Sequence, residues 1–356
     1  MQTRFLTLDR LEPQHELAWR RLVDRSVDAN PFFEPDFLMP AARHLGARGG
    51  GLLVLEDSTD WLACLPVTSR ATKLQVPVLA GWRTPYTFLG TPLVAQGHED
   101  ALPELLLDGL KGRLSGVAMV DQVPRASGAW AALADSLVVG DLVAVARRDF
   151  ERAAFDPSVH GTQLPLSSKR RANLRRTRRR LEERLGADAE FVQLEADERN
   201  IRRFLELEAS GWKGNAGTAV AAQPEHAVFF ADLCWRFALA GRLELTAIRC
   251  AGRTVAMATM LTSRDCRFAF KLAFDEEFRQ QAPGTQLIVE VAEHCSKSDV
   301  GLIDSCSDPE NDTMNRLWPD RRPLVSVVLA RPGVRAGVLK RAARLAGAAG
   351  ARDAVA

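Results

Sequence analysis

The stretch Arg267–Asp304 constrains the fold more than any other part of this sequence. Its first eight positions alternate between two kinds of side chain, as a β-strand does when its two faces differ. A polar loop follows, then a helix predicted over Thr285–Ser296, then a short strand predicted over Gly301–Ser305. The alternation assigns one set to a single face, namely Phe268, Phe270, Leu272 and Phe274, and the other set to the opposite face, namely Arg267, Ala269, Lys271 and Ala273.

The loop before this helix has the chemistry of a phosphate-binding corner. A helix start presents unpaired backbone N–H groups and the positive end of the helix dipole, and both favour a phosphate. Glycine lets a ligand approach the backbone, proline stiffens the loop, and arginine adds a charge-assisted contact. A simple turn before a packing helix would use the same residues, so both interpretations stay open. The residues are Arg279, Gln280, Gln281, Ala282, Pro283, Gly284 and Thr285.

The rest of the chain predicts a mixed α/β protein of two parts. The second part has a helix from Ser167 to Leu185, stopped by Gly186, two further helices, and a hairpin across Ala251-Gly252-Arg253. The first part has a hairpin, a leucine-rich helix and a β-rich run predicted over Leu137–Val145. We place the domain boundaries at residues 1–155, 156–330 and 331–356, the last being a basic Ala/Gly/Arg tail that we expect to be partly disordered.

Composition excludes several classes of protein. The chain is 46% hydrophobic and 26% charged with a net charge of only +2, which is ordinary for a globular protein and argues against a general nucleic-acid binder. The six cysteines are scattered, so neither a disulfide framework nor a metal site is expected. No signal peptide or apolar stretch of membrane-spanning length is recognised, so we expect a cytoplasmic protein without a transmembrane segment.

The order hairpin, long strand, R-x-x-x-P-G-T loop, helix and short strand resembles the acetyl-CoA-binding core of the GNAT acyltransferase superfamily. Residues 165–322 more narrowly resemble the acetyltransferase-like CelD/BcsL type associated with cellulose biosynthesis, which is related to the Fem peptidyltransferases. The resemblance rests on Leu166–Arg176, Trp212-Lys213-Gly214, Phe274–Leu287 and Ile303-Asp304, with Asn30–Leu38 in the first half.

The resemblance implies two tandem GNAT-like halves, each a mixed central sheet flanked by helices, with an acyl-CoA bound mainly by the second half. The cofactor would contact the loop and the end of the long strand at Lys271, Leu272, Ala273 and Phe274, where a backbone N–H would polarise the thioester carbonyl. Lys271 would alternatively bind an anionic acceptor or be solvated. The acceptor would contact Trp212, Lys213, Glu310 and Trp318, although the two tryptophans are equally suited to packing.

The catalytic groups are less well defined by the sequence. Asp304 at the end of the short strand, or Asp308 in the following loop, is the candidate general base, against the alternatives of a strand-end carboxylate and a turn residue. The family continues here with a glycine and a Tyr-Lys pair, whereas this chain has Ser305-Cys306-Ser307, and its single tyrosine is Tyr86. A nucleophilic Cys306 is disfavoured because no histidine is close in sequence.

The segment Lys169–Arg184 carries nine basic residues against Glu182 and Glu183. It is interpreted as a solvated helix, a contact for an anionic substrate or the 3′-phosphate of acyl-CoA, or a nucleic-acid contact.

The sequence supports three candidate functions. The first is metal-free direct N- or O-acyl transfer to an amino sugar, a polysaccharide precursor or an amino-acid-derived metabolite. The second is Fem-like transfer from aminoacyl-tRNA, the minority interpretation, and the third is a degenerate accessory module for exopolysaccharide synthesis. A homodimer is compatible with each.

Overall fold

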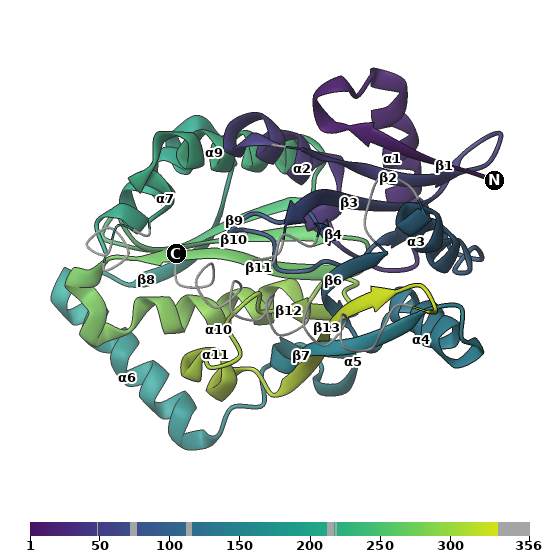
Figure 1. Ribbon diagram of the computed structural model, residues 1–356. Helices are drawn as coiled ribbons and strands as arrows, with labels where there is room; N and C mark the ends of the chain where they lie inside the picture. The colour runs from purple at the N-terminus through teal and green to yellow at the C-terminus, as the bar shows by residue number, and fades with distance from the viewer. Residues whose placement is uncertain (48, 72–76, 112–115, 212–216, 218, 334–356) are drawn as a thin grey trace. The chain divides into compact units, whose positions relative to one another are not determined.

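The computed structural model describes residues 1–47, 49–71, 77–111, 116–211, 217 and 219–333 (Figure 1). The chain divides into two compact units. Unit 1 comprises Met1–Glu151 and the segment that begins at Pro323, and unit 2 comprises Arg152–Arg322. The predicted tail from residue 334 onward lies outside the described residues. Across the described ranges, no helix combines the length and apolar character needed to cross a bilayer.

Unit 1 contains a sheet in the order β1-β2-β3-β4-β6-β13, with β5 paired to β3. Its neighbouring strands are antiparallel, except that β4 and β6 run parallel. The elements are β1 (Gln2–Thr7), α1 (Pro13–Arg25), α2 (Pro35–Ala41), β2 (Gly50–Glu56), β3 (Trp61–Ala71), β4 (Pro77–Gly81), β5 (Leu93–Val94), α3 (Ala101–Lys111), β6 (Val117–Pro124), α4 (Gly128–Val139), β7 (Val143–Phe155) and β13 (Asp320–Ala330), the last two of which cross into unit 2.

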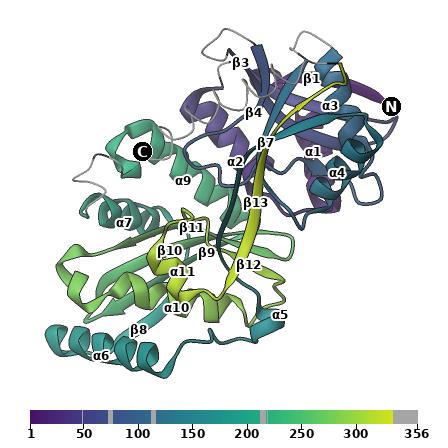
Figure 2. The ribbon, with the colours of Figure 1, turned by 60° about the horizontal axis from the view of Figure 1, so that its bottom comes forward.

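Unit 2 contains strands in the order β12-β11-β10-β9-β8, with the end of β7 paired to β12. Helices α7 and α9 cover one face of this sheet, and α6 and α10 cover the other (Figures 1 and 2). The elements are α5 (Pro157–His160), α6 (Ser168–Leu185), β8 (Ala189–Leu194), α7 (Glu198–Ala209), α9 (Pro224–Leu239), β9 (Leu243–Cys250), β10 (Arg253–Ser263), β11 (Cys266–Phe274), the 3₁₀ segment η5 (Glu276–Gln281), α10 (Pro283–Cys295), β12 (Leu302–Asp304) and α11 (Asp312–Leu317).

The two units repeat the same order of elements. In unit 1, β1 is followed by α1 and α2, the antiparallel strands β2 to β4, then α3 and a strand, β6, that is parallel to β4. In unit 2, β8 is followed by α7 and α9, the antiparallel strands β9 to β11, then α10 and a strand, β12, that is parallel to β11. The prediction of two halves, each a mixed sheet flanked by helices, is confirmed.

Local sequence explains where the helices of unit 2 begin and end. The Ser167 hydroxyl accepts a hydrogen bond from the Arg170 N–H at the start of α6, and Gly186 ends this helix in the left-handed conformation, as predicted. Asp197 caps α7 in the same way through the Asn200 N–H. Although α6 is densely charged, Leu181 is fully buried and anchors the helix to the core that α10 and the sheet share.

The prediction of a β-rich run over Leu137–Val145 is wrong in its first part. Helix α4 continues to Val139 and ends at Gly140, whose φ of 87° is left-handed. Only from Val143 does the chain become β7. Val138 and Val139 are largely exposed on α4, so their β-branched side chains gave a strand signal although neither is part of a sheet or a core.

Candidate functional site

A β-bulge lies in the middle of β11. The register with β10 pairs Ala269 with Met260 and Lys271 with Thr259, so β11 accommodates one extra residue, Phe270, at that step. A bulge moves the following residues to the opposite faces. Strict alternation of Phe268, Phe270, Leu272 and Phe274 on one face, as predicted, is therefore wrong.

Side-chain contacts show the change of face. The Phe270 ring stacks on Phe230 of α9, with the ring centroids 6.2 Å apart. Leu272 and Phe274, in contrast, lie against Gly284 of α10 on the other side of the sheet. The bulge thus turns Lys271 toward the α7 and α9 face, where its Nζ lies 3.8 Å from Glu208 Oε1.

The parallel pairing between β11 and β12 is short. It joins Cys266 to Leu302, Arg267 to Ile303 and Phe268 to Asp304, where β12 ends. Strand β11 continues to Phe274 in register with β10. Strand β12 therefore pairs only with the first part of β11, and the bulge in β11 lies just beyond the last of these pairs.

The start of α10 is not capped by its N-cap residue. Ala282 occupies that position in the left-handed conformation, with φ 52° and ψ 48°, and its side chain makes no capping hydrogen bond. Pro283 has no N–H, so the first-turn amides are those of Gly284 and Thr285. In contrast, α6 and α7 are each capped by a side chain. Arg279 is exposed one turn earlier and makes no ion pair with the described residues.

Gly284 has a packing role that its sequence context did not reveal. A Cβ built there would lie 2.9 Å from Phe274 Cδ1 and 3.4 Å from Leu272 Cδ2, and the residue is buried. The missing side chain thus lets α10 approach β11 closely. The interpretation of Pro283-Gly284 as a turn before a packing helix therefore applies, and no N-cap side chain bonds to the amides of this first turn.

Two buried polar atoms lie beside this turn without a hydrogen-bond partner in the described protein. They are the side-chain oxygens Oε1 of Gln281 and Oε1 of Gln286. The Gln286 amide also donates from Nε2 to the Gln281 carbonyl at 2.8 Å, which fixes its orientation. Such an orphaned acceptor is costly unless a ligand or water donates to it. The sequence did not single out Gln286.

Asp304 is fully buried between two arginines. Its Oδ2 accepts from Arg152 Nη2 at 2.7 Å and from Arg322 Nη1 at 2.6 Å, and its Oδ1 accepts from the Cys306 N–H at 2.8 Å. Burial alone would raise the pKa of Asp304, but the attraction of Arg152 and then Arg322 lowers it below its ordinary value. A carboxylate held in this way is a poor proton acceptor, so the geometry favours a structural role over the predicted role as general base.

The other predicted residues after β12 do not gather at one place. The Asp308 carboxylate accepts from the Glu310 N–H at 2.8 Å, which is a turn contact, and both side chains are exposed. Trp318 is 1% exposed and belongs to the core of unit 2. Cys306 is buried, and burial, followed by the Asp304 charge, raises its thiol pKa well above the usual value. Trp212 and Lys213 lie outside the described residues.

A polar cluster that the sequence did not predict surrounds Lys271. We call it the bulge cluster: Lys271 on β11, Glu208 on α7 and His226 on α9. Glu208 is 3% exposed, and its Oε2 accepts from the Val220 N–H at 2.8 Å. Burial, aided by the Lys271 charge and opposed by Glu225, lowers the pKa of His226. One sequence feature could have revealed this cluster. Glu208 is an acidic residue four positions after Phe204, on the buried stripe of α7.

Comparison with known proteins identifies the class to which this geometry belongs. Residues 168–311 match the family described as acetyltransferase (GNAT) domain. No curated protein matches the sequence. The matched stretch covers α6 through β12. It includes the β11 bulge, the start of α10 and the three residues of the bulge cluster.

Three solved structures share the fold over almost the whole chain. FemX superposes with a TM-score of 0.60 at 10% identity, covering 92% of this chain and 97% of that one. A conserved protein of unknown function from Bacteroides thetaiotaomicron gives 0.59 at 12% identity, covering 93% and 100%. The C-terminal domain of a putative lysylphosphatidylglycerol synthetase from Agrobacterium fabrum gives 0.54 at 13% identity, covering 93% and 96%.

The matched domain and the shared fold support a transferase. Residues 168–311 of unit 2 match the GNAT acetyltransferase domain, and unit 1 repeats the order of elements of unit 2.

Proposed function

We propose that this protein is an acyl-CoA-dependent N- or O-acyltransferase whose co-substrate binds unit 2 at the start of α10. The observation that carries the proposal is the uncapped first turn with the Gly284 and Thr285 amides, preceded by the exposed Arg279, which makes no ion pair with the described residues. Main-chain amides at a helix start favour the diphosphate of a nucleotide thioester. The predicted contacts at Arg279–Thr285 are retained in this proposal.

The thioester would lie at the β11 bulge, next to the point where β12 ends. A backbone N–H in the Lys271–Phe274 segment would hold the carbonyl oxygen, as a preorganised donor does in acyl transfer. The residues retained from the sequence for this contact are Lys271, Leu272, Ala273 and Phe274. Gln281 and Gln286 would supply acceptors for N–H groups of the co-substrate.

The bulge cluster supplies the acid–base chemistry in this proposal. His226 has a lowered pKa, so its imidazole is neutral near pH 7 and can accept the proton of the attacking amine or hydroxyl. The new bond joins the acceptor's nitrogen or oxygen to the acyl carbon, the carbon–sulfur bond breaks, and the thiolate leaves. Lys271 sits beside Glu208, and it would orient an anionic or hydroxylated acceptor.

The acceptor class follows from the resemblance of residues 165–322 to the CelD/BcsL type. We assign an amino sugar, a polysaccharide precursor or an amino-acid-derived metabolite, with acetyl-CoA or another acyl-CoA as donor. Thioester cleavage that depends on a metabolite extract would support enzymatic turnover. If the protein binds acyl-CoA tightly but does not cleave the thioester with the extract present, the result would instead support the degenerate accessory module.

The test of the co-substrate site is calorimetric titration of acetyl-CoA against a matched pair of variants, Ala282→Asp and Ala282→Asn. Both residues tolerate the left-handed conformation of position 282, but only aspartate adds a negative charge at the helix start. At roughly 7 Å near a protein surface, that charge costs about 2 kcal/mol per phosphate charge, at least about tenfold in affinity. Ala282→Asn should bind within a few-fold of wild type. Equal affinity in both variants would refute the site.

A second function, transfer from an aminoacyl-tRNA, is favoured by one observation on α6. Four of its cations are exposed and make neither an ion pair nor a side-chain hydrogen bond with the described residues, whereas Arg178 and Arg184 are paired with Glu290 and Glu277. Such a face would contact phosphates with a strong salt dependence. RNA that co-purifies and is released at high salt would support this function, and nucleic-acid-free protein with full acyl-CoA turnover would contradict it. The four are Lys169, Arg175, Arg179 and Arg180.

A further inference from the structure

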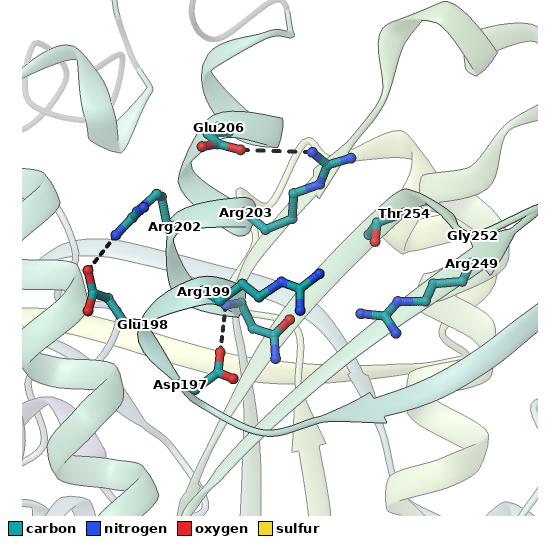
Figure 3. A pocket seen from close by; sticks show the side chains of 10 residues that line it. Asp197, Glu198, Arg199, Arg202, Arg203, Glu206, Arg249, Gly252 and Thr254 are labelled. Atoms are coloured by element: carbon teal, nitrogen blue, oxygen red, sulfur yellow. Dashed lines mark hydrogen bonds and ion pairs between the residues drawn. The ribbon is translucent and has the colours of Figure 1, made fainter.

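A polar cavity lies in unit 2, away from the β11–α10 turn. It has a volume of about 800 Å³, and its wall is formed by the first turns of α7 and by the turn between β9 and β10 (Figure 3). Because α7 and α10 lie on opposite faces of the sheet, this cavity and the proposed co-substrate site are separate. We call it the arginine pocket.

Only some of the charged side chains that line the arginine pocket have a partner of opposite charge. Arg202 pairs with Glu198 along α7, and Arg203 lies 3.8 Å from Glu206. Asp197 is engaged as the helix cap, its Oδ1 accepting from the Asn200 N–H at 2.7 Å.

Arg199 and Arg249 remain without a carboxylate partner among the described residues that line the pocket. Figure 3 shows their guanidinium groups extending from α7 and β9 into the same space. Glu190 stands opposite Arg249 in the β8–β9 register, yet it makes no ion pair with it.

Two unpaired guanidinium groups that face each other repel unless an anion lies between them. The planar fork of each group matches two oxygens of a phosphate. A third polar group lies on the same wall: Thr254, paired with Arg249 in the β9–β10 register, is 6% exposed and is a lining residue. Because paired residues of neighbouring strands share a face of the sheet, its side chain lies on the same face as Arg249.

We infer that the arginine pocket binds a small molecule that carries a phosphate group. The cavity volume exceeds that of a single phosphate and lies in the range of small-molecule sites. Arg199 and Arg249 grip the phosphate from opposite walls, Thr254 donates to it, and the rest of the ligand occupies the remaining space. The site does not depend on the function proposed above, because it uses none of the same residues.

Calorimetric titration with inorganic pyrophosphate at fixed ionic strength tests this inference on the full chain. Wild type should bind saturably, and Arg199→Gln and Arg249→Gln should each lose about tenfold or more in affinity, since each removes a charge-assisted contact. Arg202→Gln is the matched control: it removes an exposed arginine of the same wall that is already paired with Glu198, and it should bind within about twofold of wild type. Arg199 is exposed on α7, so its variant is expected to fold even if Arg249→Gln does not.

Two further arms separate this site from its alternatives. Ala282→Asp should keep pyrophosphate binding, because it alters only the helix start of α10, and acetyl-CoA affinity should be unchanged in Arg199→Gln. Citrate serves as the carboxylate probe and should bind more weakly than pyrophosphate. The inference is overturned if pyrophosphate does not bind saturably, if all three arginine variants bind equally, if citrate binds more tightly, or if Ala282→Asp abolishes the binding.

Discussion

Replacing Asp304 by asparagine tests whether the carboxylate of this residue has a structural or a catalytic role. The native carboxylate is fully buried, with hydrogen bonds of 2.6–2.7 Å to two guanidinium groups and one of 2.8 Å to the Cys306 amide. Asparagine keeps one acceptor oxygen but turns an NH₂ group toward these donors, and it leaves Arg152, 2% exposed, without a counter-charge. Breaking a buried pair in this way costs about 3–5 kcal/mol.

The loss should be visible as reduced thermal stability. For a unit of this size, a cost of 3–5 kcal/mol lowers Tm by about 6–20 °C, which circular dichroism measures directly. Asp308→Asn, at an exposed turn carboxylate, is the control and should change Tm little. If Asp304→Asn melts within about 2 °C of wild type while acyl transfer is abolished, Asp304 is a catalytic base, and the reasoning from its burial is refuted.

The same carboxylate gives a pH dependence of definite sign. Its folded-state pKa is depressed, with the arginine charges outweighing burial. Its contribution to stability is therefore fully present above the unfolded value of about 4 and is lost as pH falls through the folded pKa. The acid limb of a Tm-versus-pH curve should accordingly be shallower in Asp304→Asn than in wild type, and parallel limbs would contradict this.

Three other substitutions probe the start of α10, the bulge cluster and the buried Cys306. Gly284→Ala should destabilise the protein by about 1–3 kcal/mol in thermal unfolding, because its Cβ meets the Phe274 ring at 2.9 Å; an unchanged Tm would show that α10 can shift freely. His226→Gln should remove the acid limb of the pH–rate profile, which in wild type lies below pH 6.5 because the imidazole pKa is lowered; a limb that persists would exclude His226 as the base. Cys306→Ala should leave turnover unchanged, because burial keeps the thiol protonated; loss of turnover without loss of stability would indicate a nucleophile.

Much of the local structure around the site could be predicted from the sequence. The strand predicted from Arg267 is β11 (Cys266–Phe274), and the helix predicted over Thr285–Ser296 is α10 (Pro283–Cys295). These elements carry strong local signals, since their apolar residues recur with the period of a strand or a helix. The helix boundary was late by two residues because Pro283 and Gly284 suit a turn as well as a first helical turn.

What the sequence could not provide depends on contacts between distant residues. The bulge at Phe270 is a property of the register with β10, and an alternating run of phenylalanine and leucine looks identical with or without it. Asp304 is paired with Arg152 and Arg322, which lie in other strands or strand edges and carried no signal of their own. Glu208 lies within 3.8 Å of Lys271, and His226 is close enough to feel the Lys271 charge, because α7 and α9 pack on the same face of the sheet.

The amides at the start of α10 are the groups on which the proposed co-substrate site depends most. Hydrogen–deuterium exchange of a peptide that covers Ala282–Leu287 reports on the Gly284 and Thr285 amides, which are uncapped in the free protein. Saturating acetyl-CoA should slow their exchange, while desalting should restore the original rate. Exchange that is unchanged in this peptide, although the protein is saturated with acetyl-CoA, would contradict the central claim.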